Sequence, residues 1–327
     1  MKYRRFGRLE WNVSEVGYGM WGVAGGEGGW TGSSDVSGMA ALEHSIQLGC
    51  NFFDTAWIYG RGHSEKMLGE ALRNHPGKTL YVATKVPPKN REWPSHRGDR
   101  LDQIFPPDHI EEYVEKSLQS LGLASLDLLQ FHVWEDAWAH DESWIRVVDD
   151  LKRQRLIRGI GISVNRWEPT NVLDTLKTGM IDAVQVIYNV FDQAPDDELL
   201  PLCRELDIAV IARVPFDEGS LTGNLTIDST WPAGDWRSSY FVPENLAATV
   251  ARVESLRRAL PADTQLSDVA LRFILSNDNV ATTIPGMRSI PHVEANMACS
   301  DKGKIEPALM TLLRQHRWDR EPTAWSQ

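Results

Sequence analysis

The sequence predicts an α/β fold of the (β/α)8, or TIM, barrel class, with all 327 residues in a single domain. Three observations predict it. Short apolar runs of strand length alternate with segments of helical periodicity, the alternation continues along nearly the whole chain, and it forms eight strand–helix units without a long linker. Such alternation is typical of a parallel sheet with helical crossovers, and eight units favour a closed barrel over an open sheet.

The elements follow in order after a hairpin-like N-terminal stretch. Barrel strands are expected at 13–19, 51–56, 80–86, 126–132, 159–164, 183–188, 209–213 and 281–284. Helices are expected at 36–48, 64–74, 108–121, 142–156, 169–177, 198–206, 266–276 and 292–298. Ser64 is the expected N-cap of the second helix, because its hydroxyl can accept a hydrogen bond from a backbone N–H of the first turn.

The composition is that of a globular protein and narrows the functional class. Hydrophobic residues make up 42% and charged residues 24% of the chain, and the formal net charge is −11. This acidic balance argues against nucleic-acid binding, which needs clustered cations. No apolar run reaches the roughly eighteen residues of a membrane helix, and the N-terminus lacks the apolar core of a signal peptide. The three cysteines form no CxxC pair, so buried free thiols and a cytoplasmic location are expected.

A glycine-rich run near the N-terminus matches a dinucleotide-binding pattern. The residues from Gly17 to Gly22 read GYGMWG, which fits GxGxxG. A Rossmann fold would begin a helix inside this motif. Here more glycines follow instead: Gly25, Gly26, Gly28 and Gly29. We interpret the run as a turn at the end of a strand.

Two long connections predict where the functional face lies. They span 87–107 and 215–243, and both follow strands. In a barrel, loops that follow strands emerge at the C-terminal face, where the active sites of this fold lie. The last segment, 304–327, contains Trp318 and Trp325 and is expected to pack over the barrel.

Four polar side chains lie at or just beyond the ends of three successive strands. Asp54 ends NFFD and is followed by Tyr59, Lys85 ends YVATK, and His132 ends LLQFH. Taken singly, each has an ordinary explanation: a turn carboxylate, a rim aromatic, a solvent-facing lysine and a core histidine. Their joint occurrence at neighbouring strand ends favours a catalytic group.

These residue types together suit the reduction of a carbonyl, which needs a hydride donor and a group that protonates the developing alkoxide. A tyrosine keeps its proton at neutral pH because its ordinary pKa is about 10, and a nearby ammonium lowers that pKa by favouring the phenolate. Tyr59 is therefore the expected acid, and Lys85 the group that tunes it. Asp54 would hold Lys85, and His132 would orient the carbonyl oxygen.

The stretches NFFDTAWIYG, ATKV and LLQFH resemble the strand-end motifs of the aldo-keto reductases. GIGIS, VQVIYN, FDEGSLTG and IPGMRSIPHVEANM extend the resemblance over almost the whole chain. The resemblance implies a barrel that binds NADP(H) in an extended form without a Rossmann domain. It also implies hydride transfer from the nicotinamide to an aldehyde or ketone, with the four roles just described.

The same resemblance implies contacts with the cofactor. Ser163 and Gln185 match residues that hold the nicotinamide carboxamide, and Arg288 matches the one that grips the 2′-phosphate. A guanidinium pairs well with phosphate, which gives a reason for NADP(H) over NAD(H). The full set of matching positions is Ser163, Gln185, Arg213, Gly219, Ser220, Leu221, Gly286, Arg288 and Asn296.

Several of these positions depart from the family pattern. Arg213 stands where many members have a tyrosine that stacks under the nicotinamide; a guanidinium can also stack, but it adds positive charge, and a salt bridge is its alternative role. Ala295 replaces a common glutamate and His292 a commonly basic or polar residue beside the adenine contact, which loosens the expected preference for NADP(H). Asn165 shares a strand face with Ser163, but no contact is assigned to it.

The chain has thirteen tryptophans, and several fall at strand ends or in the long loops. Indoles over a barrel mouth suit an apolar or aromatic substrate cavity. Trp21, Trp57 and Trp134 are expected to line that cavity because they are close to strand ends. Packing between loops is an equally good explanation for the rest: Trp93, Trp231 and Trp236.

Three functions remain open. They are the carbonyl reductase, an NADPH-binding regulatory barrel that associates with a partner protein, and a metal- or phosphate-dependent barrel enzyme. The intact tetrad favours the first, and no metal-binding spacing such as HExxH supports the third. The expected partner is a small carbonyl substrate, with no metal, nucleic acid or membrane; the sequence fixes neither the natural substrate nor the oligomeric state.

Overall fold

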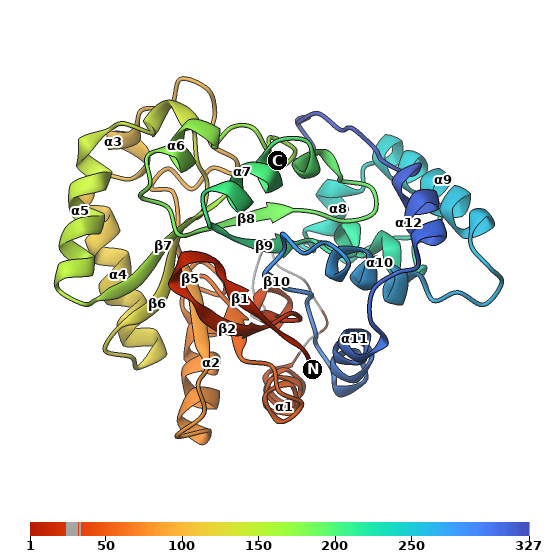
Figure 1. The fold of residues 1–327 in the computed structure, drawn as a ribbon, viewed down its shortest axis with the longest axis horizontal. Coiled ribbons are helices and arrows are strands. Elements are labelled where there is room, and N and C mark those ends of the chain that lie inside the picture. Colours follow the sequence, from red (N-terminus) through yellow and green to blue (C-terminus); the bar gives the residue numbers. More distant parts are fainter. Residues whose placement is uncertain (24–31, 33, 327) are drawn as a thin grey trace.

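The computed structural model shows eight parallel strands surrounded by helices, with the N-terminal hairpin lying over the centre of the ring (Figure 1). The structure describes residues 1–23, 32 and 34–326, so Gly25, Gly26, Gly28 and Gly29 lie outside the described residues. The barrel strands are β3 (Tyr18–Gly19), β4 (Phe52–Asp54), β5 (Tyr81–Val86), β6 (Leu126–Phe131), β7 (Ile157–Ser163), β8 (Ala183–Ile187), β9 (Ala209–Arg213) and β10 (Thr282–Thr283).

Hydrogen bonding runs around the barrel in chain order. Each strand from β3 to β10 pairs in parallel with the next, and the two edges meet through bridges from Val16 to Thr283 and from Gly19 to Gly286. Gly19 is needed at this closure, because an added Cβ would lie 2.6 Å from the carbonyl oxygen of Ile284. The predicted (β/α)8 barrel is confirmed.

Eight helices correspond to the predicted ones. They are α1 (Asp35–Gln47), α2 (His63–Asn74), α4 (Pro107–Leu121), α5 (Glu142–Arg153), α6 (Leu173–Lys177), α7 (Leu199–Glu205), α10 (Leu266–Leu275) and α11 (Ile290–Lys302). Sequence explains their limits: α4 begins with proline at its first position and ends before Gly122, which has a φ of 68°. On α5 the buried residues recur at helical spacing, namely Trp144, Val147, Val148 and Leu151.

Four further helices were not predicted. Two short ones lie inside the long loops, and two longer ones lie in the C-terminal half: α3 (Leu101–Ile104), α8 (Arg237–Tyr240), α9 (Pro243–Ala259) and α12 (Pro307–Arg314). The tail beyond α12 packs on the barrel as expected, since Trp318 donates its backbone N–H to the carbonyl of Phe191 over 2.8 Å.

Two local predictions were wrong. Ser64 does not cap α2: the helix begins at His63 after Gly62, and the Ser64 hydroxyl lies 2.8 Å from that of Thr55 instead. The expected first strand, 13–19, is divided between the hairpin strand β2 (Trp11–Ser14) and the barrel strand β3.

The predicted hairpin closes the N-terminal end of the barrel. It consists of β1 (Tyr3–Phe6) and β2, and its aromatic side chains enter the barrel core. Phe6 lies 5.3 Å from the ring of Phe52, and Trp11 stacks on Tyr81 at 4.9 Å. These buried rings seal the barrel floor.

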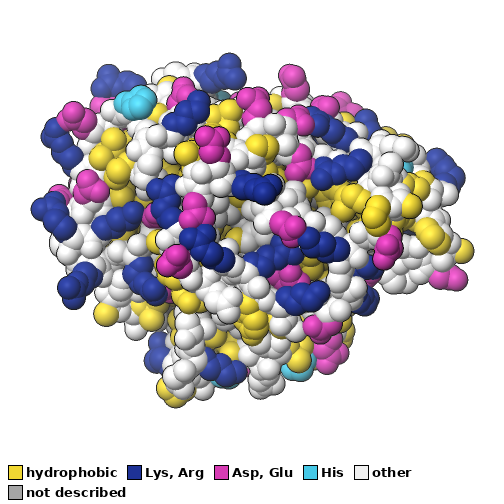
Figure 2. Space-filling model, viewed as in Figure 1, with side chains coloured by type: hydrophobic (Ala, Val, Ile, Leu, Met, Phe, Trp, Pro, Cys, Tyr) yellow, Lys and Arg dark blue, Asp and Glu magenta, His cyan; other side chains and the backbone are white. Residues whose placement is uncertain are grey.

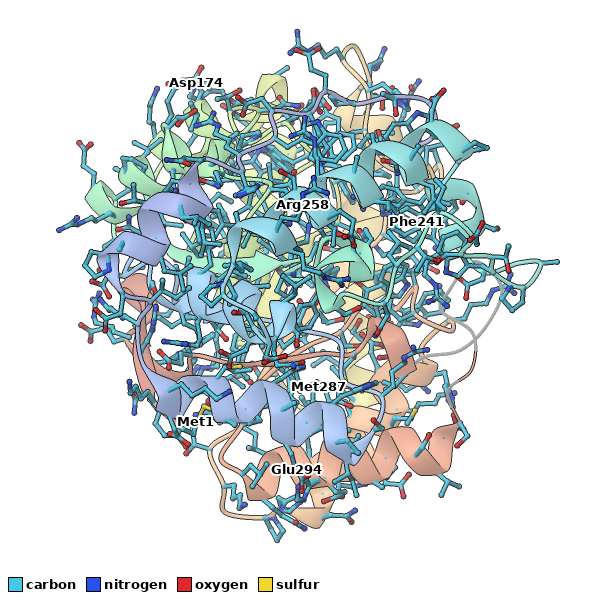
Figure 3. All side chains as sticks on the ribbon, turned by 90° about the vertical axis from the view of Figure 1, so that its right-hand side faces the viewer. Met1, Asp174, Phe241, Arg258, Met287 and Glu294 are labelled. Atoms are coloured by element: carbon cyan, nitrogen blue, oxygen red, sulfur yellow. The ribbon has the colours of Figure 1, made fainter. Side chains whose placement is uncertain are left out.

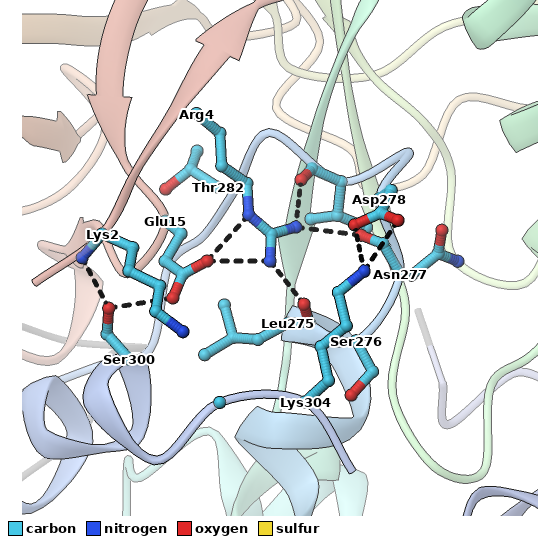
Figure 4. Close-up of polar contacts among 12 residues, drawn as sticks. Lys2, Arg4, Glu15, Leu275, Ser276, Asn277, Asp278, Thr282, Ser300 and Lys304 are labelled. Carbon is cyan, nitrogen blue, oxygen red and sulfur yellow. Dashed lines mark hydrogen bonds and ion pairs between the residues drawn. The ribbon is translucent and has the colours of Figure 1, made fainter. Parts of the chain in front are cut away.

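Arg4 ties the hairpin to the end of α10 (Figure 4). Its guanidinium donates to the carbonyl oxygens of Leu275, Asn277 and Val280, and it pairs with Glu15 at 2.8 Å. A cation at a helix C-terminus interacts favourably with the unpaired carbonyls there. The arrangement fastens the N-terminus across the barrel.

The surface carries mixed charge. On the face that bears the hairpin, acidic and basic side chains are interspersed (Figure 2). All three cysteines are buried and free, as predicted. In the part of the chain that the structure describes, no helix is long and apolar enough to cross a membrane.

Candidate active site

A cavity of about 1060 Å³ opens at the C-terminal face of the barrel, where the two long loops meet the strand ends. Asp54, Tyr59 and His132 line it. Figure 3 views the molecule from the side of α9 and α11, with the labelled Phe241 and Met287 on two segments that border the cavity. The long loops thus border a cavity on the face where the sequence predicted the functional site.

The structure brings three residues of the predicted tetrad into direct contact. Lys85 is fully buried, and its ammonium nitrogen donates to Asp54 Oδ2 over 2.7 Å and to the carbonyl oxygen of Thr55 over 2.8 Å. The same nitrogen lies 3.4 Å from the hydroxyl oxygen of Tyr59. This is the Asp–Lys–Tyr chain expected from the strand ends.

Two glutamines complete the shell around Asp54. Gln185 donates from Nε2 to Asp54 Oδ1 over 2.7 Å, and Gln130 donates to the same oxygen over 3.1 Å. Both amides are buried at the centre of the barrel. They fix the carboxylate and leave its other oxygen for Lys85. Gln130 was not predicted; its signal is a polar residue inside the apolar run LDLLQF.

Burial sets the proton affinities in this group. Burial alone would lower the pKa of Lys85, but Asp54 and Tyr59 together raise it above its usual value, so the side chain is a cation. Burial also raises the pKa of Tyr59, helped by Asp54 and opposed by Lys85 and Arg213. The sequence argument that a nearby ammonium would bring the pKa of Tyr59 below its usual value is therefore corrected: Lys85 pulls in that direction, but burial outweighs it.

His132 stands beside Tyr59 with its ring nearly perpendicular. The two ring centroids are 5.9 Å apart, and Trp93 lies 5.6 Å from the imidazole on another side. Burial, with smaller contributions from Lys85 and Arg213, holds the pKa of His132 well below its usual value. The imidazole is therefore neutral at physiological pH. Its Nδ1 is buried without a hydrogen-bond partner.

Most of the residues predicted to contact the cofactor line the cavity. Those that line it are Ser163, Gln185, Arg213, Gly219, Gly286, Arg288 and Asn296. Ser220 and Leu221 do not line it: both side chains are fully buried, and the Ser220 hydroxyl donates to Asp217 over 2.7 Å. Asn165 lines the cavity too, but its amide is engaged with buried groups that include Glu135.

A cationic corner lies at the far end of the cavity. Arg237, Arg288 and His292 all line it, and Asp235 is the nearby acid, paired with Arg237 at 2.7 Å. Burial and the neighbouring Arg237 lower the pKa of Arg288, while Asp235 opposes them. Burial and Arg288 likewise lower the pKa of His292. Two guanidinium groups beside a single carboxylate favour an anionic ligand group.

Arg213 is a cation near Tyr59 and Asp54. One of its Nη atoms donates to the carbonyl oxygen of Val164 over 3.1 Å, and its Nε is buried without a partner. Burial and Arg166 lower the pKa of Arg213 to about 10. Among the described residues no carboxylate forms an ion pair with Arg213, so the salt-bridge alternative is not what the structure shows.

The aromatic lining differs from the prediction. Trp21 lines the cavity, 6.4 Å from the ring of Tyr59. Trp134 does not: it is fully buried among core aromatics and donates from Nε1 to the Thr175 hydroxyl. Trp57 packs against Tyr113 outside the lining. The lining indoles that sequence proximity did not favour are Trp93, Trp231 and Trp236. Distance from a strand end along the chain does not tell which way an indole turns.

Sequence reasoning also missed an ion pair in the lining. Arg166 donates to Glu218 over 2.6 Å, and both residues border the cavity. Nothing local in the sequence pairs two residues so far apart.

Among the described residues, no group of three or more His, Cys, Asp or Glu side chains is arranged to hold a metal ion.

Comparison with known proteins gives consistent results. The sequence model described as "Aldo/keto reductase family" matches residues 15–317. A protein of Escherichia coli called an NADH-specific methylglyoxal reductase is 29% identical and covers 96% of this chain and 98% of its own. An aldo-keto reductase of Schizosaccharomyces pombe, named with NADP(+), is 26% identical and covers 93% and 88%. The holo structure of an aldo-keto reductase of Bacillus halodurans superposes with a TM-score of 0.77 at 25% identity, over 100% of both chains.

Proposed function

The chain belongs to the aldo/keto reductase family, and from this premise we propose that it reduces aldehydes or ketones to alcohols with NADPH, with Tyr59 as the general acid. The observation that carries the proposal is the Asp54–Lys85–Tyr59 chain at the base of an open cavity. Membership of the family makes the protein an oxidoreductase that acts on carbonyl groups with a nicotinamide cofactor. The choice of cofactor and the roles of single residues are the proposal.

The cavity fits a nicotinamide dinucleotide. Its volume of about 1060 Å³ lies at the upper limit of the roughly 300–1,000 Å³ of ligand pockets, as a ligand larger than a single drug-sized molecule requires. Space for a cofactor backbone exists at Gly286, where an added Cβ would meet no atom within 4 Å. The buried, unpartnered Nε of Arg213 and the cationic corner offer donors to such a ligand.

In this proposal the cofactor supplies a hydride to the carbonyl carbon. Tyr59 and His132 receive the carbonyl oxygen between them, which orients the bond. As negative charge develops on that oxygen, the Tyr59 hydroxyl donates its proton to it. The adjacent Lys85 ammonium stabilises the tyrosinate that is left, and Asp54 keeps Lys85 charged and in place.

His132 acts as a neutral donor. Because its pKa is held well below the usual value, the imidazole donates a hydrogen bond without competing with Tyr59 to transfer a proton. A fixed donor aimed at an oxygen that gains charge stabilises the transition state more than the ground state. Trp21 and Trp93 flank these two residues and exclude water from the reacting groups.

The proposed preference for NADPH rests on the cationic corner. The three positive or polarisable side chains Arg237, Arg288 and His292 would surround the 2′-phosphate that NADPH has and NADH lacks. A charge-assisted hydrogen bond to phosphate is roughly twice as strong as a neutral one. The relative named as NADH-specific shows that the family also contains the opposite preference, so this point needs a direct test.

The test follows nicotinamide absorbance while the purified protein meets a panel of aldehydes and ketones, with NADPH and NADH in parallel. Loss of absorbance that depends on the carbonyl compound, and is faster with NADPH, supports the proposal. Tight binding of NADPH without reduction of any compound would instead favour the regulatory barrel.

A further inference from the structure

Two consecutive acids of the loop after β9 are held by arginines from distant parts of the chain. Asp217 and Glu218 precede Gly219, and the last two of these border the cavity. Arg166, which follows β7, donates to Glu218 over 2.6 Å. Arg320, from the C-terminal tail, donates from Nη2 to Asp217 Oδ1 over 2.7 Å. All four charged side chains are mostly or fully buried.

The backbone conformation of this loop depends on contacts such as these ion pairs. The φ angles are 55° at Val214, 46° at Asp217, 55° at Glu218 and 98° at Gly219. The left-handed region is unfavourable for residues other than glycine, above all for a β-branched one, and it persists only where surrounding contacts hold it. Three non-glycine residues in that region within five positions make the shape of the loop depend on its contacts.

Arg320 is itself fixed on every side. Its side chain is 3% exposed, and its guanidinium carbon lies 4.6 Å from the ring centroids of both Trp167 and Trp318. Nε donates to Asp192 Oδ1 over 3.1 Å, and Nη2 pairs with the other oxygen of the same carboxylate. Arg320 thus has two carboxylate partners, and only Asp217 belongs to the loop after β9.

The contact continues into the loop. The second oxygen of Asp217 accepts from the Ser220 hydroxyl over 2.7 Å, so this one carboxylate links the tail to both sides of the turn at Gly219. The tail also approaches the cavity directly: Ser326 borders it, and Trp325 packs 5.9 Å from Trp167.

We propose that Arg320 is a positioning residue for cofactor binding, which it controls by fixing the loop of residues 217–219 through Asp217. The inference rests on the proposed function, in which the cofactor occupies the cavity that Glu218 and Gly219 of this loop border. It gives the C-terminal tail a role in holding the cofactor. Arg320 itself touches no reacting atom.

Two matched variants separate this role from plain structural support. Asp217→Asn and Asp192→Asn each neutralise one partner of Arg320 with almost no change of shape, but only the first lies on the loop. The dissociation constants of NADPH and NADH are measured by quenching of tryptophan fluorescence, and thermal unfolding is followed in parallel. D217N should weaken NADPH binding about tenfold, while D192N should change it by less than about twofold. The kcat of D217N at saturating cofactor should stay within about twofold of the wild type.

Arg320→Gln and Arg317→Gln form a second pair in the tail. Arg317 lies at the surface in ion pairs with Asp197 and Asp319, so its variant should bind NADPH as the wild type does. R320Q should weaken binding as D217N does, and the double variant R320Q/D217N should add little to either. An unchanged dissociation constant in D217N, or an equal rise in D217N and D192N, would overturn the role of Arg320. Failure of the wild-type protein to bind either nucleotide would instead overturn the proposed function.

Discussion

The ammonium nitrogen of Lys85 lies 3.4 Å from the hydroxyl oxygen of Tyr59, at a position fully shielded from solvent. A buried cation so close to a phenol stabilises the phenolate more than it would in water, because the surroundings screen it less. Under the proposed function, proton donation by Tyr59 would therefore be coupled to the charge of Lys85. Several measurable consequences follow from this contact and from the residues around it.

Tyr59→Phe should lower the rate of carbonyl reduction about a thousandfold, because it removes the proton donor and leaves the cavity intact. Binding of NADPH should stay within about twofold of the wild type, as measured by fluorescence quenching. Tyr3→Phe, at the exposed surface, is the control and should keep full activity. Turnover in Y59F close to that of the wild type would show that another group is the acid.

The rate of reduction should stay level between about pH 6.5 and pH 9. Burial raises the pKa of Tyr59, so the acid keeps its proton through this window, and the pKa of His132 is held well below its usual value, so the imidazole stays neutral. The unfolded chain takes up a proton at His132 below its ordinary pKa while the folded chain does not, so His132 lowers stability as pH falls below about 6.5. The imidazole would not be neutral if kcat/KM of the wild type titrated near pH 6.5 and His132→Gln abolished that titration.

Arg288→Ala should weaken NADPH binding about tenfold or more and leave NADH binding almost unchanged, because only NADPH brings a phosphate to the cationic corner. Isothermal titration of both nucleotides with both proteins measures the difference. Arg61→Ala, well removed in sequence from this corner and outside the lining, is the matched control. If the affinities for NADPH and NADH fell equally, Arg288 would contact a part of the cofactor that both nucleotides share.

Trp21 and Trp134 should respond to mutation in opposite ways. Trp21 lines the cavity beside Tyr59, so Trp21→Ala should raise the KM of an apolar aldehyde about tenfold with little change in stability. Trp134 is fully buried and bonded to Thr175, so Trp134→Phe should lower the free energy of unfolding by about 2 kcal/mol and leave KM unchanged. Urea unfolding and steady-state kinetics on both variants test these expectations. A raised KM in W134F would indicate that Trp134 contributes to the substrate site.

Arg4→Ala should lower the free energy of unfolding by about 3 kcal/mol, because it leaves the buried Glu15 and the last carbonyls of α10 without their cation. Arg5→Ala, which breaks only exposed pairs with Asp207 and Glu10, should change it by less than about 1 kcal/mol. Equal unfolding midpoints in urea for the two variants would show that the contact in Figure 4 does not stabilise the hairpin.

The barrel could be predicted from sequence where local pattern and tertiary position agree. The strand Ala209–Arg213 lies at its predicted limits, because an apolar run ends there in a polar residue at the barrel mouth. The helix Pro243–Ala259 was missed because its buried side includes Asn245 and Thr249, which break the apolar periodicity. The contacts among Asp54, Tyr59 and Lys85 were predictable because these residues lie at or just beyond strand ends, and parallel strands bring their ends together.

The rest of the site depends on side-chain direction and on long-range pairing. Ser220 follows a glycine in the loop and looks like a ligand, yet its hydroxyl turns inward to Asp217. Arg166 and Glu218 meet across 52 positions of sequence, a separation over which no local pattern carries information. The sequence around Trp134 and Trp236 does not tell which indole faces the cavity, and only the folded loops decide it.

The aromatic hairpin that closes the N-terminal end of the barrel also limits the route by which ligands reach the cavity. With Phe6 and Trp11 filling that end, molecules that react inside can use only the mouth on the opposite side. Under the proposed function, a ligand held deeper in the cavity would therefore bind first and leave last. The closed N-terminal end of the barrel would thus set the order in which ligands bind and are released at the opposite end.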